Sequence, residues 1–189
     1  MSAEPNPPDW RVSQWFNTPA PLSLAALRGR VVMALAFQML CPGCVAHALP
    51  QAQRVRETFP EKDVSVIGLH TVFEHHDAMT PVSLMAFLHE YRIGFPVGVD
   101  EPSPAIAMPR TMAAYQMRGT PTLLIYDRSG GLRRHYFGHV GDLQLGADLI
   151  ALVDSQMMPS AAVEAADGTD RCSATIDPFT TSAAGQRDT

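Results

Sequence analysis

The chain alternates between short apolar runs and segments with helically spaced apolar residues. The runs of strand length are residues 31–38, 63–69, 95–100 and 121–127. The first two runs are almost uninterrupted, which predicts strands covered on both faces. Apolar residues about three or four positions apart predict helices, which are expected at residues 45–59, 81–93, 111–117 and 141–157.

A further strand-length run, residues 132–138, follows residues 121–127 after the tetrapeptide Arg-Ser-Gly-Gly. Two such runs joined by a glycine-containing turn predict a β-hairpin. Before the hairpin, strands and helices alternate, which predicts parallel strands, and the hairpin adds an antiparallel edge. The sequence therefore predicts a single α/β sandwich.

The two ends of the chain differ from this core. Residues 1–21 contain five prolines, so an extended arm is expected there. Three large aromatic residues are the predicted anchors of this arm: Trp10, Trp15 and Phe16. Residues 22–158 form the predicted domain, which starts with a short helical turn at 22–30. Residues 159–189 are rich in small and polar side chains and form a predicted tail.

Composition and charge exclude several classes of protein. With 46% apolar and 17% charged residues, the 189-residue chain has the makeup of a globular domain rather than of a disordered chain. A net charge of -5 argues against a nucleic-acid partner. No apolar stretch approaches the roughly 18 residues of a membrane helix, and the first residues lack the pattern of a signal peptide. We therefore expect a cytoplasmic protein without a membrane partner.

Three cysteines occur in the chain: Cys41, Cys44 and Cys172. They are too few for the disulfide scaffold of a secreted domain, and in a reducing compartment a close pair serves catalysis, redox sensing or metal binding. Structural zinc needs four ligands, usually with a second close cysteine pair, which this sequence lacks. Cys172 lies in the predicted tail, where it is either an inert thiol or an additional resolving cysteine.

The sequence Cys-Pro-Gly-Cys at 41–44 comes between an apolar run and a predicted helix. If the helix starts near Pro42, Cys41 lies at its N-terminus, where unpaired N–H groups and the helix dipole stabilise a thiolate. Cys44 is one turn further on and can reach back to close a disulfide. This placement predicts that Cys41 attacks and that Cys44 resolves. Next to a βαβ pattern, such a pair is typical of thioredoxin-like redox proteins.

Roughly residues 20–157 resemble thioredoxin-fold redoxins of the TlpA-type and AhpC/TSA group. The resemblance rests on residues 27–38 leading to Cys-Pro-Gly-Cys, on Val-Ser-Val-Ile-Gly-Leu at 64–69, and on residues 118–131 with their Gly-Thr-Pro-Thr. It implies a thioredoxin-like α/β fold with a central mixed sheet flanked by helices. The implied activity is thiol–disulfide exchange with a protein or a small thiol. No cofactor is implied, because the dithiol itself carries the two electrons.

The resemblance also implies a substrate surface. Pro121 would be the cis-proline that packs against the cysteine pair, and the backbone of Thr120 would offer strand-like hydrogen bonds to an extended substrate. The other residues expected on this surface flank the nucleophile: Leu40, Pro42 and Gly43. Leu40 stands where the family usually has an aromatic residue, which changes the surface around Cys41.

His47 occupies the position of an acidic residue in TlpA-type proteins. It lies one helical turn beyond Cys44, so it could face the pair and relay protons near neutral pH. The alternative is a helix histidine held by a neighbouring residue. TlpA-type proteins are usually exported or membrane-anchored, and because this sequence shows no such signal, their extracytoplasmic role is not carried over.

A thiol peroxidase is the alternative enzyme. Aligned with the Thr-Pro-Gly-Cys of some peroxiredoxins, Cys44 becomes the peroxidatic thiol. Phe37 and Cys41 stand at the positions of the proline and the threonine of that family, and Arg118 comes two residues too early to match its arginine. These departures make disulfide exchange the preferred hypothesis.

The loop after the second predicted strand is rich in metal-ligating side chains. Its candidate ligands for zinc or copper are His70, Glu74, His75 and His76. Ligand sites of open α/β sheets form at the carboxyl ends of strands, so this loop and the cysteines are expected on the same side of the sheet. The loop is either part of a metal-binding or redox-sensing module, or a solvated polar loop whose spacing matches no metal motif.

The sequence leaves the oligomeric state of the protein open.

Overall fold

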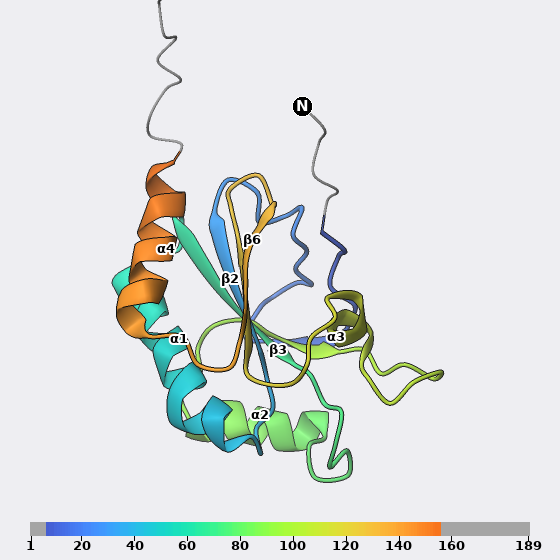
Figure 1. Ribbon diagram of the computed structural model, residues 1–189. Helices are drawn as coiled ribbons and strands as arrows, with labels where there is room; N and C mark the ends of the chain where they lie inside the picture. Colours follow the sequence, from blue (N-terminus) through green and yellow to red (C-terminus); the bar gives the residue numbers. More distant parts are fainter. Residues whose placement is uncertain (1–6, 156–189) are drawn as a thin grey trace, which may run out of the picture. The chain divides into compact units, whose positions relative to one another are not determined.

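The computed structural model describes residues 7–155, which form a six-stranded mixed sheet flanked by helices (Figure 1). The strands are β1 (Val12–Phe16), β2 (Val31–Phe37), β3 (Val64–His70), β4 (Val97–Asp100), β5 (Thr122–Tyr126) and β6 (Leu132–Phe137). The helices are the π-helix η1 (Cys44–Ala48), α1 (Leu49–Thr58), α2 (Pro81–Glu90), α3 (Arg110–Ala114) and α4 (Asp142–Asp154). No helix in this range is long and apolar enough to cross a membrane. The predicted tail with Cys172 lies outside the described residues.

The strand order across the sheet is β1-β4-β3-β2-β5-β6. Strands β2, β3 and β4 are parallel, whereas β5 is antiparallel to β2 and β6 is antiparallel to β5. The predicted parallel strands and closing hairpin are therefore confirmed. Because of these directions, the ends of β2, β3 and β6 and the start of β5 lie at one end of the sheet. We call this the C-terminal end of the sheet.

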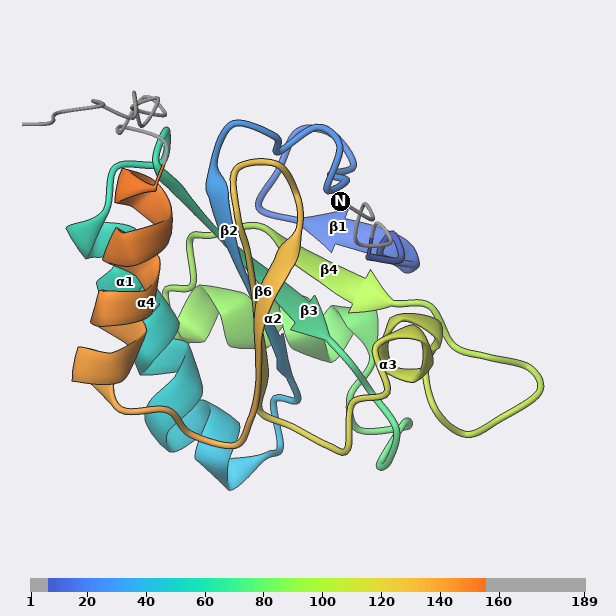
Figure 2. The same ribbon diagram turned by 45° about the horizontal axis from the view of Figure 1, so that its top comes forward.

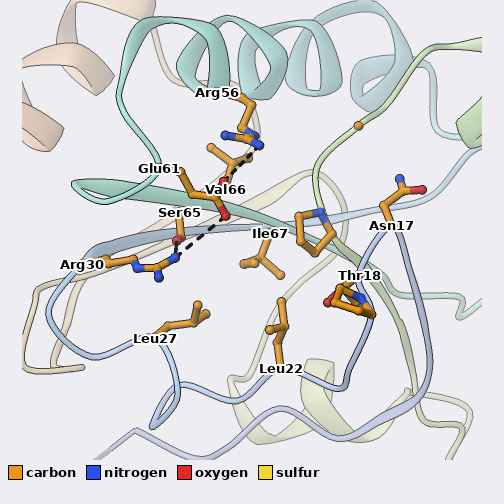
Figure 3. A pocket seen from close by; sticks show the side chains of 13 residues that line it. Asn17, Thr18, Leu22, Leu27, Arg30, Arg56, Glu61, Ser65, Val66 and Ile67 are labelled. Carbon is orange, nitrogen blue, oxygen red and sulfur yellow. Dashed lines mark hydrogen bonds and ion pairs between the residues drawn. The ribbon is translucent and has the colours of Figure 1, made fainter.

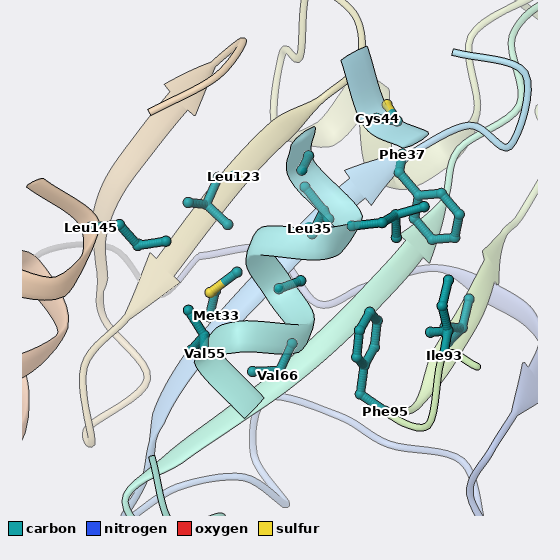
Figure 4. Close-up of a cluster of buried hydrophobic side chains, with 14 of the residues drawn as sticks. Met33, Leu35, Phe37, Cys44, Val55, Val66, Ile93, Phe95, Leu123 and Leu145 are labelled. Carbon is teal, nitrogen blue, oxygen red and sulfur yellow. The ribbon is translucent and has the colours of Figure 1, made fainter. Parts of the chain in front are cut away.

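Strand β2 is buried along its whole length because both faces of the sheet are covered. Met33 and Leu35 face a cluster with residues of α1, α2 and α4 (Figure 4). Val32 and Ala34 face the opposite cluster, which contains residues of α3 and of the N-terminal arm. Figure 2 shows α3 on the other side of the sheet from α1 and α4. Alternate residues of a strand point to opposite faces, so two covered faces account for the continuous apolar run.

The N-terminal arm is part of the sheet, which the sequence interpretation missed. Strand β1 pairs antiparallel with β4, so the arm covers an edge of β4 that would otherwise be open. Trp10 is buried and its indole N–H donates to the hydroxyl of Tyr126 at 3.2 Å. The short helical turn predicted at 22–30 takes the form of successive hydrogen-bonded turns rather than a regular helix, and it ends at Gly29 with a φ of +89°.

The helix after the cysteines is continuous from Pro42 to Thr58 but changes its winding. The π-helical part, η1, directly precedes α1, and Pro50 lies in the first turn of α1. Proline has no N–H to donate to the preceding turn, which accounts for the wider winding just upstream. The proline inside the helix expected at 45–59 is therefore preceded by a π-helical turn.

Candidate functional site

The cysteine pair follows β2 at the C-terminal end of the sheet. The N–H of Cys41 donates to the carbonyl of Gln38 at 3.2 Å, and the carbonyl of Cys41 accepts the N–H of Val45 at 3.1 Å. Cys41 therefore stands at the N-terminus of the helix. Its side chain is half-buried, the side chain of Cys44 has 0% exposure, and both are free thiols.

Thr120 and Pro121, which precede β5, form the wall opposite the cysteine turn. The peptide bond between them is cis. The Cys41 thiol donates to the Thr120 carbonyl, with 3.5 Å between sulfur and oxygen. A Cβ added to Gly43 would stand 3.6 Å from Cδ of Pro121, so the turn and the proline ring are close neighbours. The fold thus brings the cysteine turn next to Thr120 and Pro121, although Cys41 and Thr120 are 79 positions apart in the sequence.

The two sulfurs have different surroundings. The N–H of Cys44 donates to Sγ of Cys41 at 3.3 Å, and such a hydrogen bond stabilises negative charge on the sulfur. Burial, and after it the neighbouring Cys41 thiol, raises the pKa of Cys44 to about 12. Figure 4 shows Cys44 at one end of the apolar cluster, close to Phe37. Cys41 is therefore the accessible sulfur, and Cys44 is an enclosed thiol.

Exposed apolar side chains flank Cys41. Leu40 is 55% exposed, Pro42 is also exposed, and Gly43 is half-buried. All three lie in the turn that carries Cys41, and Leu40 and Pro42 are open to solvent. Leu40 therefore leaves an exposed apolar side chain directly before Cys41.

Arg118 and Phe137 lie beside the site, and the sequence reasoning did not include them in it. Phe137, the last residue of β6, is paired with Thr122 at the start of β5. Its ring lies near Gly119, where an added Cβ would stand 3.2 Å from the ring. The guanidinium carbon of Arg118 is 4.7 Å from the centroid of the Phe137 ring. The hairpin was the available signal, because its register brings the end of one strand next to the start of the other.

The ring of His47 has its described partner away from the cysteines. Its ring is exposed and lies 5.4 Å, centroid to centroid, from the ring of His139, with which it lines a pocket of about 500 Å³. In the described part of the chain, no hydrogen bond joins His47 to Cys41 or Cys44. Because η1 is π-helical, the third residue after Cys44 points in another direction than in an α-helix. The proton-relay hypothesis therefore has no hydrogen bond to support it and stays a prediction from the sequence.

The histidine-rich loop is not assembled as a metal site. His70 ends β3 with 1% exposure, and neither ring nitrogen has a hydrogen-bond partner among the described residues. Burial lowers the pKa of His70 to about 4. Glu74, His75 and His76 are exposed instead. Within residues 7–155, no three His, Cys, Asp or Glu side chains are grouped so that they could hold a metal ion.

A pocket of about 260 Å³ opens near the starts of β2 and β3 (Figure 3). Glu61 lies 3.2 Å from Arg56 and 3.9 Å from Arg30, and Arg30 also donates to Ser65 at 3.4 Å. The charged groups of this pocket therefore pair with one another. The length of β2 separates the pocket from the cysteines, so it does not belong to the candidate site.

The profile of the AhpC/TSA family matches residues 8–135, which include the cysteine pair, Thr120 and Pro121. The chain belongs to the AhpC/TSA family. The resemblance to this group of thioredoxin-fold redoxins, inferred from short motifs, is thereby confirmed.

Solved structures agree with an AhpC/TSA protein of thioredoxin-like fold. The thioredoxin-like superfamily protein SPOA0173 is 63% identical, with a TM-score of 0.77 over 78% of this chain and 96% of its own. A thiol-disulfide isomerase from Corynebacterium glutamicum is 47% identical, with a TM-score of 0.75 over 78% and 97%. A thioredoxin-like protein in the oxidized form shares the fold at 20% identity and a TM-score of 0.66, over 80% and 95%. The comparison with curated proteins finds no match.

Proposed function

We propose that this protein is a thiol–disulfide oxidoreductase in which Cys41 is the nucleophile and Cys44 the resolving thiol. The proposal rests on one observation, the different exposure and hydrogen bonding of the two cysteine side chains. Cys41 is partly open to solvent and accepts the N–H of Cys44, whereas the side chain of Cys44 is fully buried. The 47% identity to a thiol-disulfide isomerase supports the same class of reaction.

The first step is attack by the Cys41 thiolate on one sulfur of a partner's disulfide. A bond forms between Cys41 and this sulfur while the partner's own S–S bond breaks. The departing sulfur leaves as a thiolate and takes a proton from solvent. The N–H of Cys44, 3.3 Å from Sγ of Cys41, stabilises the attacking thiolate beforehand.

In the second step, Cys44 attacks the Cys41 sulfur of the mixed disulfide. The Cys44 proton passes to the departing partner thiolate, so the partner leaves with both sulfurs reduced and the protein keeps a Cys41–Cys44 disulfide. The raised pKa keeps Cys44 a thiol until this attack, which prevents it from competing with Cys41 for the partner. The same steps in reverse oxidise a partner dithiol, and neither direction needs an organic cofactor.

An extended peptide fits beside the nucleophile. The N–H of Thr120 donates to no other described residue, and its carbonyl accepts from the Cys41 thiol. In this proposal both backbone groups pair with a partner strand, the carbonyl exchanging the Cys41 thiol for the partner, while Leu40 and Pro42 offer apolar contact. We propose protein disulfides as the partner class. The small-thiol partner and the cytoplasmic location stay predictions from the sequence.

The peroxidase alternative requires Cys44 to meet a peroxide. Its side chain has 0% exposure, and its raised pKa leaves little thiolate near neutral pH. Phe37 stands at the proline position of peroxiredoxins and Cys41 at the threonine position. The thiol of Cys41 cannot replace the threonine hydroxyl that contacts the peroxide. The geometry therefore favours disulfide exchange.

A redox titration against glutathione tests the proposed function, with trapped thiols assigned residue by residue by mass spectrometry. We expect a reversible two-electron couple between Cys41 and Cys44, within the range of about -270 to about -120 mV that known dithiol oxidoreductases span. The variant Cys44→Ser should accumulate a stable mixed disulfide at Cys41. If neither the couple nor the mixed disulfide forms, the exchange function is refuted.

A further inference from the structure

Arg118 and Phe137 form a cation–aromatic pair next to the exchange site. The guanidinium carbon of Arg118 stands 4.7 Å from the ring centroid of Phe137, and this ring is 49% exposed. Contact with the ring restricts the guanidinium, so less side-chain freedom is lost when it binds an anion. Gly119 permits the arrangement, because an added Cβ there would stand 3.2 Å from the ring.

The positive charge of Arg118 is not paired. Among the described residues, no carboxylate lies within ion-pair distance of its guanidinium, in contrast to several other arginines. The paired arginines include Arg110 with Glu101, Arg128 with Asp63 and Arg134 with Asp148. Burial lowers the pKa of His135 on β6, and the charge of Arg118 lowers it further. An uncompensated cation therefore lies on an exposed aromatic ring.

The position of this pair relates it to the substrate. Thr120 comes two residues after Arg118. The carbonyl oxygen of Thr120 lies 3.5 Å from Sγ of Cys41. Two residues span at most roughly 7 Å, so the guanidinium can meet a side chain close to the reacting cysteine of a strand paired with Thr120. The carboxylates of Glu74 and Asp77 follow β3, which lies on the other side of β2 from β5. They therefore do not compensate the charge beside Thr120.

We propose that Arg118, stacked on Phe137, selects partner segments that carry an acidic side chain near the reacting cysteine. This selection rests on the proposed thiol–disulfide exchange and names its substrate class, an extended peptide with Asp or Glu. A carboxylate can bind the guanidinium through two parallel hydrogen bonds, while the open part of the Phe137 ring contacts apolar groups of the same segment. An exposed ion pair of this kind changes a rate by about two- to fivefold and weakens with added salt.

A set of short peptide disulfides tests the selection. Each peptide has a central cysteine, with Glu, Gln or Lys two positions away on both sides, and is offered to the reduced protein as its disulfide-linked dimer. Each second-order rate is divided by the rate with dithiothreitol, which removes differences in the peptides' own reactivity. We expect Glu to react fastest and Lys slowest, with steps of about two- to fivefold. The spread should shrink at about 1 M salt, where the Debye length is about 3 Å.

Variants separate a local charge from a general effect. Arg118→Glu should reverse the order of the peptides, which mere loss of structure cannot do. Arg118→Lys should keep the order with a smaller spread, because the planar stack is lost. Phe137→Ser should reduce the spread and Phe137→Tyr should preserve it. The matched control is Arg92→Glu, an equal change of net charge at an exposed arginine between α2 and β4, where the parallel strands begin. It should leave the order unchanged.

The outcomes distinguish the two proposals. Equal relative rates for all three peptides would overturn the charge selection and leave the exchange function standing. Absence of exchange with every peptide would overturn the exchange function, and the charge selection with it. A reversal caused by Arg92→Glu as well would assign the preference to the overall charge of the protein, and not to Arg118.

Discussion

Two regions at the C-terminal end of the sheet carry chemically reactive side chains: the turn with Cys41 and the loop after His70. They differ in how many parts of the chain surround them. Around Cys41, three parts of the chain meet: the turn after β2, the Thr120–Pro121 segment before β5, and the end of β6. After His70, by contrast, the chain leaves β3 through a loop whose charged side chains stay in solvent. Residue types alone marked both regions as candidate sites.

Reactive residues form a site only where segments that are distant in the sequence meet around them. Cys41 interacts with the N–H of Cys44 and with the carbonyl of Thr120, so its position is defined from both sides. His70 is buried with its ring 5.4 Å from that of Phe37, and its nitrogens have no partner among the described residues. Each unsatisfied buried group costs about 1–3 kcal/mol, so burial of this histidine reduces stability.

The largest contrast between the two regions should appear in the rate of disulfide exchange. Cys41→Ser removes the nucleophile and should lower this rate on the order of 10⁴-fold or more. The double variant His75→Ala/His76→Ala changes only exposed rings and should stay within about twofold of the wild type. Quenched single-turnover reactions with a peptide disulfide measure both. A comparable loss in the double variant would show that the loop takes part in exchange.

The two cysteines should differ by about a hundredfold or more in alkylation rate. With a pKa of about 12, Cys44 carries on the order of 10⁻⁴ thiolate at about pH 8, and its side chain is enclosed. Brief iodoacetamide treatment of the native, reduced protein, followed by peptide mass spectrometry, should find the label on Cys41. Unfolding in urea is the control and should remove the difference. Equal labelling of the native protein would contradict the division of roles between the two thiols.

His70 should make the folded state less stable in acid. Burial lowers its pKa from 6.5 to about 4, so between these values the unfolded chain binds a proton that the folded chain does not. This cost is absent above about pH 6.5 and grows as the pH falls, to at most about 3 kcal/mol near pH 4. Urea unfolding of the wild type and of His70→Leu across this range measures the difference, which the variant should remove. Identical pH dependence would mean that His70 is not kept neutral by the fold.

The smallest effect is expected at Gly43. Its φ of -64° and ψ of -32° are helical, and an added Cβ would make an ordinary contact of 3.6 Å with Cδ of Pro121. Gly43→Ala should therefore raise the free energy of unfolding by about 0.5–1 kcal/mol and leave the exchange rate within about twofold. Urea unfolding and the peptide assay test the two parts. A large loss of exchange with unchanged stability would show that the partner contacts the bare backbone at Gly43.

The sequence by itself determined the central architecture and the reactive pair. The continuous apolar run at 31–38 and the hairpin around residues 128–131 depend on local patterns of burial and turn residues, so strands β2, β5 and β6 were predictable. The spacing of Cys41 and Cys44 at a helix start is likewise local, since one helical turn brings the two residues together.

Only the tertiary structure decided which other residues join or leave the site. The register of β6 against β5 places Phe137 beside Arg118, and the winding of η1 turns His47 toward His139. The pairing of β1 with β4 made a strand from a segment rich in proline. Packing against Phe37 buried His70 away from its loop. These outcomes depend on contacts between segments remote in sequence, whose register and packing no local pattern encodes.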